Sequence, residues 1–428
     1  MSSGDLLIHN IGQLVTCRST DGRAKHGASM LDVGIVQNGA VAIADGKFAA
    51  VGTTDEVEAK YSSTEKIDAG GRVVTPGFVD PHTHIVYAGD RLGEFELKIK
   101  GAEYLEILAA GGGIISTVKN TRAASEEDLV RSGLGRLDKM LACGTTTVEV
   151  KTGYGLNPET ELKMLRVIER LDLEHAVDIV PTFLAAHTVP PEFKGNTDGY
   201  VDLICGEMLE AALEWYEASH FVGNGTPFFC DVFTEKNAFD REQTERILNT
   251  ALDLGFRIKA HVDQFTNLGG SRLAVESGAV SIDHLDVISD DEIKHLAESD
   301  TVGVVIPTEN FSAGKTQFAP ARKLIDSGCA VAISTDFNPG SAPCPSQQMA
   351  MAIATRYQKL LPSEALNAVA INAAFAIGLG SSHGSIEVGK QADLLILDCE
   401  DHRQIAYEFG GNLVASVIKR GQIVYGSR

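Results

Sequence analysis

The sequence offers no cysteine spacing of the kind that builds disulfide frameworks or structural zinc sites. Its seven cysteines are scattered along 428 residues, and no two of them form a Cys-x-x-Cys pair. An odd and dispersed set fits neither a disulfide-stabilised fold nor a structural zinc site. We therefore expect most of these cysteines to be small, buried apolar residues.

Long apolar runs are also missing. No run reaches the roughly 18 residues that a membrane-spanning helix needs. The first residues, Met1-Ser-Ser-Gly-Asp5, have no basic region ahead of an apolar stretch, so they do not resemble a secretory signal peptide. With 44% hydrophobic residues and a mean hydropathy of +0.00, the chain has a globular composition. We expect a cytoplasmic protein without a membrane partner.

Positive charge is in short supply. The chain has 37 Lys and Arg residues against 58 Asp and Glu residues, which gives a formal net charge of −21 at pH 7. An acidic surface repels the phosphate backbones of nucleic acids, so we expect no nucleic-acid partner. A small anionic substrate would meet the same field. Its pocket would therefore need a local cation.

Both ends of the chain carry short apolar runs of β type. The runs cover residues 6–10, 34–37, 40–43 and 47–51 near the N-terminus, and 392–397, 414–418 and 422–425 near the C-terminus. Asn38-Gly39 and Asp45-Gly46 separate runs in the way that hairpin turns do. We predict one small β-sandwich domain built from residues 1–75 and 381–428.

The interval between these ends repeats an apolar run, a polar residue and an amphipathic helix. Eight such runs cover residues 78–84, 145–151, 179–187, 228–234, 256–261, 280–284, 302–308 and 331–336. Two of the helices are predicted over residues 158–173 and 240–254. Apolar strands that alternate with helices form parallel sheets buried on both faces, and eight of them favour closure. We predict an α/β fold with a TIM-like (β/α)8 barrel over residues 76–380.

Two histidines follow the first of these runs, in Pro76-Gly77-Phe78-Val79-Asp80-Pro81-His82-Thr83-His84. Residues i and i+2 of an extended strand point to the same face, so both imidazoles can reach one point. A metal ion can be held in this way. The alternative for this pair alone is two solvated loop histidines, because two-histidine motifs are short and recur by chance.

Other strand ends carry polar groups as well. Barrel enzymes place their chemistry at the carboxyl ends of the strands, and here those ends include Lys151, His187, His261, His284 and Asp336. His82, His84, His261 and Asp336 form a mixed nitrogen and oxygen set suited to zinc, with iron or manganese as alternatives. Such an ion lowers the pKa of bound water, so we expect hydrolysis.

Each of these residues also has a structural explanation when taken alone. A single histidine such as His261 is more often a hydrogen-bonded structural residue. Asp336 stands before Asn338-Pro339-Gly340 and could merely nucleate a turn. Their joint placement at strand ends favours the metal site, because random positions would rarely align in this way.

One further motif resembles part of a nucleotide-binding loop. Ala313-Gly314-Lys315-Thr316 is similar to the end of a phosphate loop, but that pattern requires a glycine at position 309. The sequence has Glu309 there. We therefore exclude nucleotide binding at this loop.

Several longer stretches resemble a known family. The two-histidine motif and the order of the later His261, His284 and Asp336 are similar to the amidohydrolase superfamily. Within it, the chain resembles the imidazolonepropionases over about residues 72–395. The stretches are His84-Ile-Val-Tyr-Ala-Gly-Asp-Arg91, Gly101-Ala-Glu-Tyr-Leu-Glu-Ile107, Lys151-Thr-Gly-Tyr-Gly-Leu156, Ala186-His-Thr-Val-Pro-Pro191 and Thr335-Asp-Phe-Asn-Pro-Gly-Ser341.

The resemblance implies a reaction and a set of ligands. It implies that water opens the ring of 4-imidazolone-5-propanoate to give N-formimidoyl-L-glutamate, a step of histidine breakdown. It also implies a homodimer and one zinc or iron ion per subunit, held by His82, His84, His261 and Asp336. Arg91 would pair with the propionate carboxylate, since arginine presents a bidentate fork to such a group.

The remaining implied substrate contacts fall on several loops. Tyr104, Tyr154 and His187 would line the ring and the tail, and Asn338, Gly340 and Ser341 would hold the far end. Position 341 departs from the family pattern, in which threonine is frequent.

Position 264 decides which residue moves protons. Some family members carry a glutamate there, whereas this chain has Gln264, and an amide cannot take a proton from water near neutral pH. We assign Gln264 to orienting the ring by hydrogen bonds. Proton transfer then falls to His284, with Asp336, because a histidine near its unperturbed pKa is suited to this task.

Two alternatives remain open from the sequence. The first is another cyclic amidine or amide hydrolase or deaminase, such as a guanine or cytosine deaminase, although Arg91 and Tyr154 argue against it. The second is a scaffold protein that keeps the barrel without catalysis, although all four ligand positions are filled.

Overall fold

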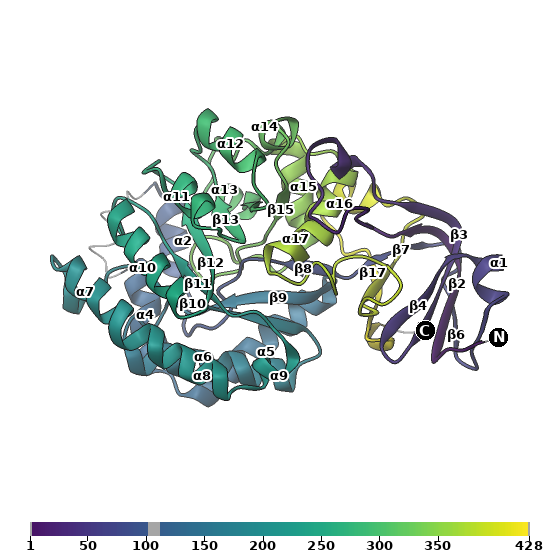
Figure 1. The fold of residues 1–428 in the computed structure, drawn as a ribbon, viewed down its shortest axis with the longest axis horizontal. Helices are drawn as coiled ribbons and strands as arrows, with labels where there is room; N and C mark the ends of the chain where they lie inside the picture. Colours follow the sequence, from purple (N-terminus) through teal and green to yellow (C-terminus); the bar gives the residue numbers. More distant parts are fainter. Residues whose placement is uncertain (1, 102–111, 427–428) are drawn as a thin grey trace.

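The computed structural model describes residues 2–101 and 112–426. A barrel wrapped in helices forms one body, and a smaller sheet at one side is built from segments near both chain ends (Figure 1). Within the described residues, no helix has both the length and the apolar character needed to cross a membrane. Four cysteines are buried and three are partly buried, and all seven are free thiols.

Eight parallel strands form the barrel in chain order. They are β8 (Phe78–Asp80), β9 (Thr145–Lys151), β10 (Asp178–Ala186), β11 (Phe229–Val232), β12 (Arg257–Val262), β13 (Ser281–His284), β14 (Val302–Val305) and β15 (Val331–Ile333). Each strand pairs with its neighbour along the chain. Each of the eight predicted runs therefore overlaps a barrel strand, and the predicted barrel is confirmed.

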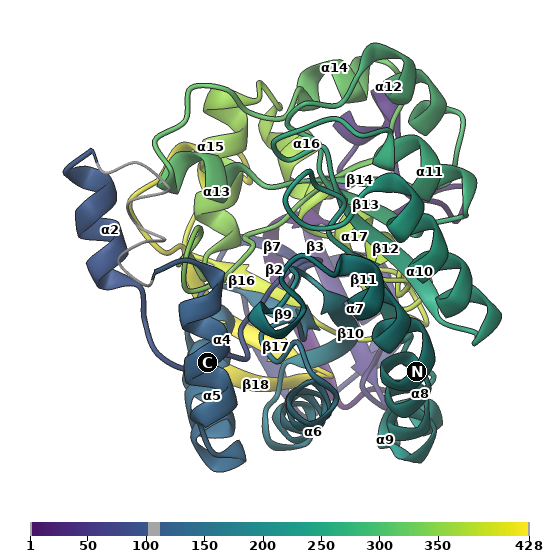
Figure 2. The same ribbon diagram turned by 90° about the vertical axis from the view of Figure 1, so that its left-hand side faces the viewer.

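Helices surround these strands in Figure 2, with α2 standing away from the ring. Those between β8 and β12 are α2 (Leu92–Ile99), α4 (Ile114–Ala123), α5 (Glu126–Ala142), α6 (Pro158–Glu174), α7 (Thr197–Leu203), α8 (Leu209–Ala218), α9 (His220–Asn224) and α10 (Arg241–Asp253). Later ones are α11 (Gly270–Glu276), α12 (Asp290–Ala297), α13 (Pro307–Ser312), α14 (Ala321–Asp326), α15 (Gln347–Tyr357), α16 (Pro362–Ala368), α17 (Ile371–Ala376) and α18 (Gln404–Tyr407). Short helical turns are η1 (Gly27–Leu31), η2 (Pro191–Phe193) and η3 (Ile204–Met208).

The two helices predicted in detail begin at strong N-terminal caps. Asn157 accepts a hydrogen bond from the Thr160 amide, and Pro158 occupies the first turn of α6. Asp240 and Gln243 form a reciprocal capping box at the start of α10. Both helices turn an apolar face toward the barrel, which is why their sequence periodicity was informative.

The first and last barrel strands meet at a seam without ladder pairing among the described residues. Side chains join them there instead. Ser334 Oγ donates to Asp80 Oδ1 at 2.6 Å. From α15, Gln347 Nε2 donates to the carbonyl oxygens of Val79 at 3.1 Å and Ile333 at 3.4 Å. We call this junction of β8 and β15 the barrel seam.

The smaller sheet draws strands from both chain ends. Its N-terminal strands are β2 (Leu6–Val15), β3 (Ile35–Ala44), β4 (Lys47–Thr53), β6 (Lys66–Asp68) and β7 (Val73–Pro76), and its C-terminal strands are β16 (Leu394–Leu397), β17 (Val414–Lys419) and β18 (Gln422–Gly426). The order is β18-β17-β16-β7-β2-β3-β4, with β6 beside β2. Antiparallel pairing of β7 with β16 joins the two ends. The predicted β domain from both chain ends is thus confirmed as a mixed sheet.

Two short strands and a short helix complete this region. The strands β1 (Ser2–Ser3) and β5 (Tyr61–Ser62) pair in parallel, and α1 (Thr54–Glu58) follows β4. Since β7 ends at Pro76 and β8 begins at Phe78, the chain passes directly from the smaller sheet into the barrel. The domain limits of 1–75 with 381–428, and of 76–380, stay predictions.

The two predicted hairpin turns have different outcomes. Asp45 and Gly46 have φ values of +52° and +70° and connect β3 to β4, as predicted. The turn predicted at Asn38-Gly39 is wrong, because β3 continues through it and pairs with β2 on both sides. A side chain at Gly39 would place its Cβ 2.6 Å from the Leu14 Cβ, so the glycine there serves close strand contact instead of chain reversal.

Candidate active site

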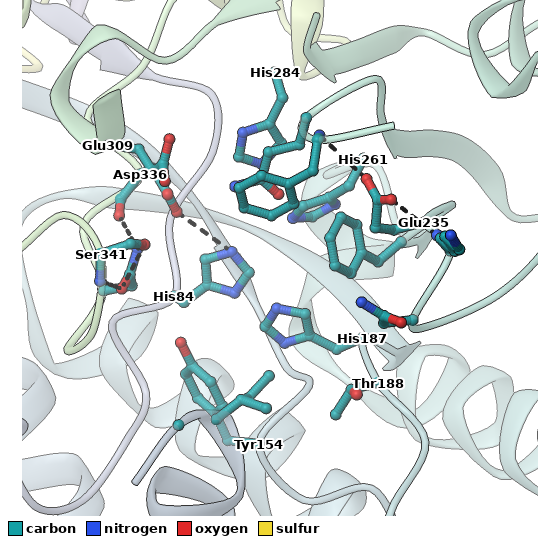
Figure 3. A pocket seen from close by; sticks show the side chains of 18 of the residues that line it. His84, Tyr154, His187, Thr188, Glu235, His261, His284, Glu309, Asp336 and Ser341 are labelled. Atoms are coloured by element: carbon teal, nitrogen blue, oxygen red, sulfur yellow. Dashed lines mark hydrogen bonds and ion pairs between the residues drawn. The ribbon is translucent and has the colours of Figure 1, made fainter. Parts of the chain in front are cut away.

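A cavity of about 560 Å³ opens at the carboxyl ends of the barrel strands. Ten of the predicted site residues line it: His84, Arg91, Tyr154, His187, His261, Gln264, His284, Asp336, Asn338 and Ser341. Figure 3 shows His84, His261, His284 and Asp336 pointing toward one another on its floor. Tyr104 lies outside the described residues.

Three histidines gather on this floor. Ring nitrogens of His82, His84 and His261 all lie within 4.8 Å of one another. The Nε2 atoms of His82 and His84 are 3.3 Å apart. Asp336 Oδ1 lies 3.5 Å from His84 Nε2 and 3.8 Å from His82 Nε2. The four predicted ligand side chains therefore face one point, although they lie after β8, in β12 and after β15, in distant parts of the sequence.

Carboxylates behind the histidines fix how the rings present their nitrogens. His82 Nδ1 donates to Asp283 Oδ2 at 2.6 Å, so His82 Nε2 keeps its lone pair toward the cavity. Asp231 Oδ2 lies 3.0 Å from His261 Nδ1, and His261 Nε2 is buried without a hydrogen-bond partner. Burial lowers the pKa of His82 and of His84 well below the usual value. Neutral rings with free nitrogens are suited to a borderline divalent ion, so this set fits a metal.

A fully buried charged layer supports these carboxylates. Lys151 Nζ lies 2.6 Å from Glu149 Oε1 and 2.7 Å from Asp231 Oδ2. Lys259 Nζ lies 3.6 Å from Asp283 Oδ2. Burial acts to lower the pKa of Lys151, but Asp231 and Glu149 outweigh it, and the net pKa is raised. Each buried charge thus has a partner, as the low dielectric of a barrel interior requires.

Two residues of the floor have unusual backbone conformations. His284 has a φ of +86° and Asp336 a φ of +49°, a region that side chains other than glycine rarely adopt. Such strain is typical of functional sites. The His284 ring centroid lies 5.2 Å from that of His261 and 5.3 Å from that of His82. The fold therefore holds His284 beside the histidine cluster at a cost in backbone energy.

The pKa values of His284 and Asp336 are both shifted, which corrects the expectation for His284. Burial, with His261 and Lys315 nearby, lowers the pKa of His284 well below the usual value, so the expectation of an unperturbed pKa is wrong. Burial therefore favours the neutral form of the His284 ring. Burial raises the pKa of Asp336 well above the usual carboxyl range, and a nearby cation would offset that shift.

Arg91 lies on the pocket wall with a carboxylate partner of its own. Its Nε and Nη2 atoms donate hydrogen bonds to Glu94 Oε2 at 2.8 and 2.6 Å. Glu94 Oε1 also accepts the Gly113 amide at 2.8 Å. A Cβ at position 340 would overlap Arg91 Nη1, so Gly340 leaves the space that the guanidinium occupies. These contacts fix the orientation of the Arg91 guanidinium group.

Tyr154 and His187 form another part of the pocket wall. The His187 ring stacks on His84 with centroids 4.9 Å apart, and Tyr154 lies 5.5 Å from His187. His187 Nδ1 donates to the Gly153 carbonyl oxygen at 3.1 Å, which leaves Nε2 as an acceptor. Burial lowers the pKa of His187 to about 3, so the ring stays neutral.

Comparison with known proteins identifies the family. Residues 73–424 match the amidohydrolase family, and residues 39–61 match the bacterial imidazolonepropionase-like composite domain. The imidazolonepropionase of Chloroflexus aggregans is 51% identical over 424 residues, which cover 99% of each chain. That of Herpetosiphon aurantiacus is 50% identical over 424 residues, covering 99% of this chain and 98% of the relative. The chain belongs to the imidazolonepropionase family.

Solved structures share the fold of this imidazolonepropionase family member at low sequence identity. An adenosine deaminase from Xanthomonas campestris with bound zinc has a TM-score of 0.71 and 19% identity, covering 100% of this chain and 94% of that chain. The guanine deaminase of E. coli has a TM-score of 0.72 and 14% identity, covering 99% of both chains. At such identities the likeness shows the fold alone. The histidine cluster is typical of amidohydrolase metal sites.

The distal loop of the imidazolonepropionase pocket is held by its own side chains. Asn338 Nδ2 donates to the Asp336 carbonyl oxygen at 2.8 Å and to Ser341 Oγ at 2.9 Å. Asn338 Oδ1 accepts the Gly340 and Ser341 amides, both at 2.8 Å. Asn338 thus shapes the loop that carries Ser341 to the pocket.

Several pocket and support residues were missed in the sequence. Glu235 and Glu309 line the cavity, and Glu149, Lys259 and Asp283 lie beneath it. Charged residues inside otherwise apolar runs, as in Val148-Glu149-Val150-Lys151, were the available signal for the buried layer. No comparable pattern marked Glu309, which lies in a helix outside the barrel strands.

Proposed function

We propose that the chain hydrolyses the carbon–nitrogen bond of 4-imidazolone-5-propanoate to give N-formimidoyl-L-glutamate, the third step of L-histidine degradation. Family membership over the full length of the chain supports the substrate. The observation that carries the chemistry is the convergence of the His82, His84 and His261 nitrogens with the Asp336 carboxylate on one point. A cation on the pocket wall, Arg91, matches an anionic substrate in an otherwise acidic protein.

One zinc or iron ion per subunit would be held by His82, His84, His261 and Asp336. When bound, such an ion polarises a carbonyl group and lowers the pKa of water. The neutral rings and the carboxylates behind them support this assignment, because they present nitrogen lone pairs to the cavity.

The protein side chains would then divide the remaining work. His284, together with Asp336, accepts the proton that the attacking water gives up and returns it to the leaving ring nitrogen. Arg91 binds the propionate carboxylate through its guanidinium. His187 Nε2 accepts a hydrogen bond from a ring N–H, and Gln264 and Tyr154 orient the ring.

A substrate panel on the purified protein tests this function. Loss of the imidazolone absorbance with formation of N-formimidoyl-L-glutamate is the expected result, with about one equivalent of metal by elemental analysis. Ammonia release from guanine or cytosine without ring opening would favour the deaminase alternative. A protein without metal and without turnover would favour the scaffold alternative.

We further propose a cytoplasmic homodimer. The family resemblance supports the dimer, and the absence of any long apolar run supports the location. Sedimentation analysis of the metal-loaded protein tests the oligomeric state, and a monomer at micromolar concentration would contradict it.

A further inference from the structure

The pocket contains one ion pair that the proposed reaction does not yet use. Glu309, in α13, lines the cavity and is only 4% exposed. Lys315 Nζ lies 3.1 and 2.9 Å from its two carboxylate oxygens. Lys315 Nζ also lies 4.6 Å from the centre of the Phe265 ring, and its side chain is 30% exposed. We call these two residues the Glu309–Lys315 pair.

Glu309 differs from the other carboxylates that line the cavity in the described part of the chain. Glu235 accepts the backbone amides of Phe265 and Thr266 at 3.1 and 3.0 Å, so it holds a loop. Asp336 faces the histidine nitrogens. Glu309 instead has its oxygens on a partly exposed ammonium group, and it lies beside Asp336 in Figure 3. It is the lining carboxylate best placed to take a new cationic partner.

Ring opening creates such a partner, if the proposed function holds. Water adds its oxygen to the ring acyl carbon while the acyl carbon–nitrogen bond breaks, and the freed nitrogen gains a proton. The new acid then loses a proton and the formimidoyl group takes one up, because an amidine is a strong base. The product therefore carries an amidinium cation. Its two N–H groups lie in one plane, a geometry that a carboxylate accepts in the way it accepts guanidinium.

We propose that Glu309 binds the formimidoyl cation as it forms and makes the pocket selective for amidines over neutral amides. Lys315 occupies the two carboxylate oxygens before the cation appears and so competes with the product for them. Since its side chain reaches solvent, the ammonium can yield one oxygen to the product without leaving a buried charge unpaired. This inference rests on the proposed function and adds a specificity determinant to it.

Binding of two matched ligands to the metal-loaded protein tests the assignment. N-formimidoyl-L-glutamate carries the cation, and N-formyl-L-glutamate is its neutral amide counterpart. Because a hydrogen bond to a charged group contributes about 1.5–3 kcal/mol, the wild-type Kd ratio should favour the formimidoyl compound by roughly 10- to 100-fold. In Glu309→Gln the ratio should fall to about 1–3, mainly through weaker formimidoyl binding.

Three other variants separate selectivity from damage to the fold. Glu309→Asp keeps the charge and should restore part of the preference. Lys315→Met leaves Glu309 without its ammonium partner and should retain or increase the preference. Glu58→Gln is the matched control, because Glu58 also pairs with a lysine, Lys66, on the smaller sheet. It should leave both affinities unchanged.

The outcomes distinguish this inference from the proposed function. Normal ring opening with an unchanged Kd ratio in Glu309→Gln would overturn the role of Glu309 alone, and so would equal weakening of both ligands. If Glu309→Gln does not fold, loss of the preference in Lys315→Met decides against the assignment. A wild-type protein that neither opens the ring nor binds either ligand would overturn both proposals.

Discussion

His284 joins three properties at the scale of a single residue: a strained backbone, a neutral ring and a position beside the histidine cluster. Replacement with alanine removes the proposed proton carrier and leaves the four predicted ligands in place. We expect His284→Ala to lower kcat by roughly 10²- to 10⁴-fold with metal content unchanged. Steady-state kinetics and elemental analysis on the same sample measure both quantities.

The control for this variant is His295→Gln, which alters a partly exposed histidine on α12 that lies 3.7 Å from Glu276. It should keep normal turnover. Near-normal turnover in His284→Ala would refute the assignment of the proton carrier.

In the proposed function, Arg91 supplies mainly binding energy. Arg91→Gln removes the charged fork but keeps a hydrogen-bonding side chain, and it leaves Glu94 without its cation. We expect KM to rise by roughly 10- to 100-fold while kcat changes much less, since a carboxylate clamp acts on ground state and transition state alike. Initial-rate measurements over a wide substrate range give both constants.

Arg131→Gln is the matched control, because Arg131 forms an exposed ion pair with Asp128 at the same i, i+3 spacing as Arg91 and Glu94. An unchanged KM in Arg91→Gln would show that another group holds the propionate.

The sequence predicted the individual ligand residues better than the residues that position the site side chains. His82 and His84 could be predicted because their two-residue spacing is a local pattern that directly follows an apolar run, at the end of β8. Glu94 could not, because its role depends on where Arg91 and the Gly113 amide meet in space. The lowered pKa of His284 was also out of reach, since it arises from burial among neighbours distant in sequence.

At the scale of elements, the loop between β9 and α6 owes its shape to one buried carboxylate. Glu161 accepts the amides of Gly153 at 3.0 Å, Gly155 at 2.7 Å and Leu156 at 2.8 Å. The same loop carries Tyr154, and its Gly153 carbonyl oxygen holds His187. Glu161 is therefore a positioning residue for one wall of the pocket.

Glu161→Gln would turn an amide N–H₂ toward backbone N–H groups and lose at least one of these bonds. We expect KM to rise about 10-fold, from loss of one or two charge-assisted hydrogen bonds. Amide hydrogen exchange of Gly153 and Gly155 should become faster. Glu159→Gln changes an exposed glutamate in the same helical turn and should alter neither quantity. Unchanged exchange in Glu161→Gln would contradict the positioning role.

Strand positions were predictable because apolar runs and helical periodicity are local. The turn at Asp45-Gly46 was predictable for the same reason. Asn38-Gly39 misled the prediction because the deciding contact, between Gly39 and Leu14, is made across the sheet. Local patterns therefore place elements, while contacts between elements decide whether a turn signal reverses the chain.

At the scale of the whole molecule, a buried carboxyl group links stability to pH. Burial raises the pKa of Asp286 to about 7, whereas aspartate in an unfolded chain has a pKa of about 3.9. The folded state thus binds this proton more tightly, so the group favours folding at low pH. That contribution is lost as pH rises from about 4 to about 7, and amounts to at most about 4 kcal/mol.

Asp286→Asn removes the titration and keeps an oxygen for Asn310 Nδ2, which donates to Asp286 Oδ1. We expect the variant to have a higher thermal midpoint than wild type at pH 8 and a smaller advantage at pH 5. Calorimetry at both pH values measures the difference. Asp291→Asn, at a side chain 80% exposed, is the control. An equal effect at both pH values would contradict the prediction.

Removal of the metal should destabilise the barrel seam before the rest of the barrel. His82 and His84 follow β8 and Asp336 follows β15, so the predicted ligands stand on both sides of this junction. We expect chelation to lower the thermal midpoint by roughly 5–10 °C. It should also speed amide exchange in β8 and β15 before the other barrel strands. Uniform acceleration around the ring would contradict this.

The same junction sets an order for biosynthesis. Asp80 and Ser334 meet although 254 positions separate them, and β7 must likewise wait for β16. During translation, His82 and His84 are therefore synthesised long before Asp336, the carboxylate that completes the predicted ligand set. Chains that terminate before residue 336 should therefore lack the complete metal site and the activity that depends on it. The site can form only late in synthesis.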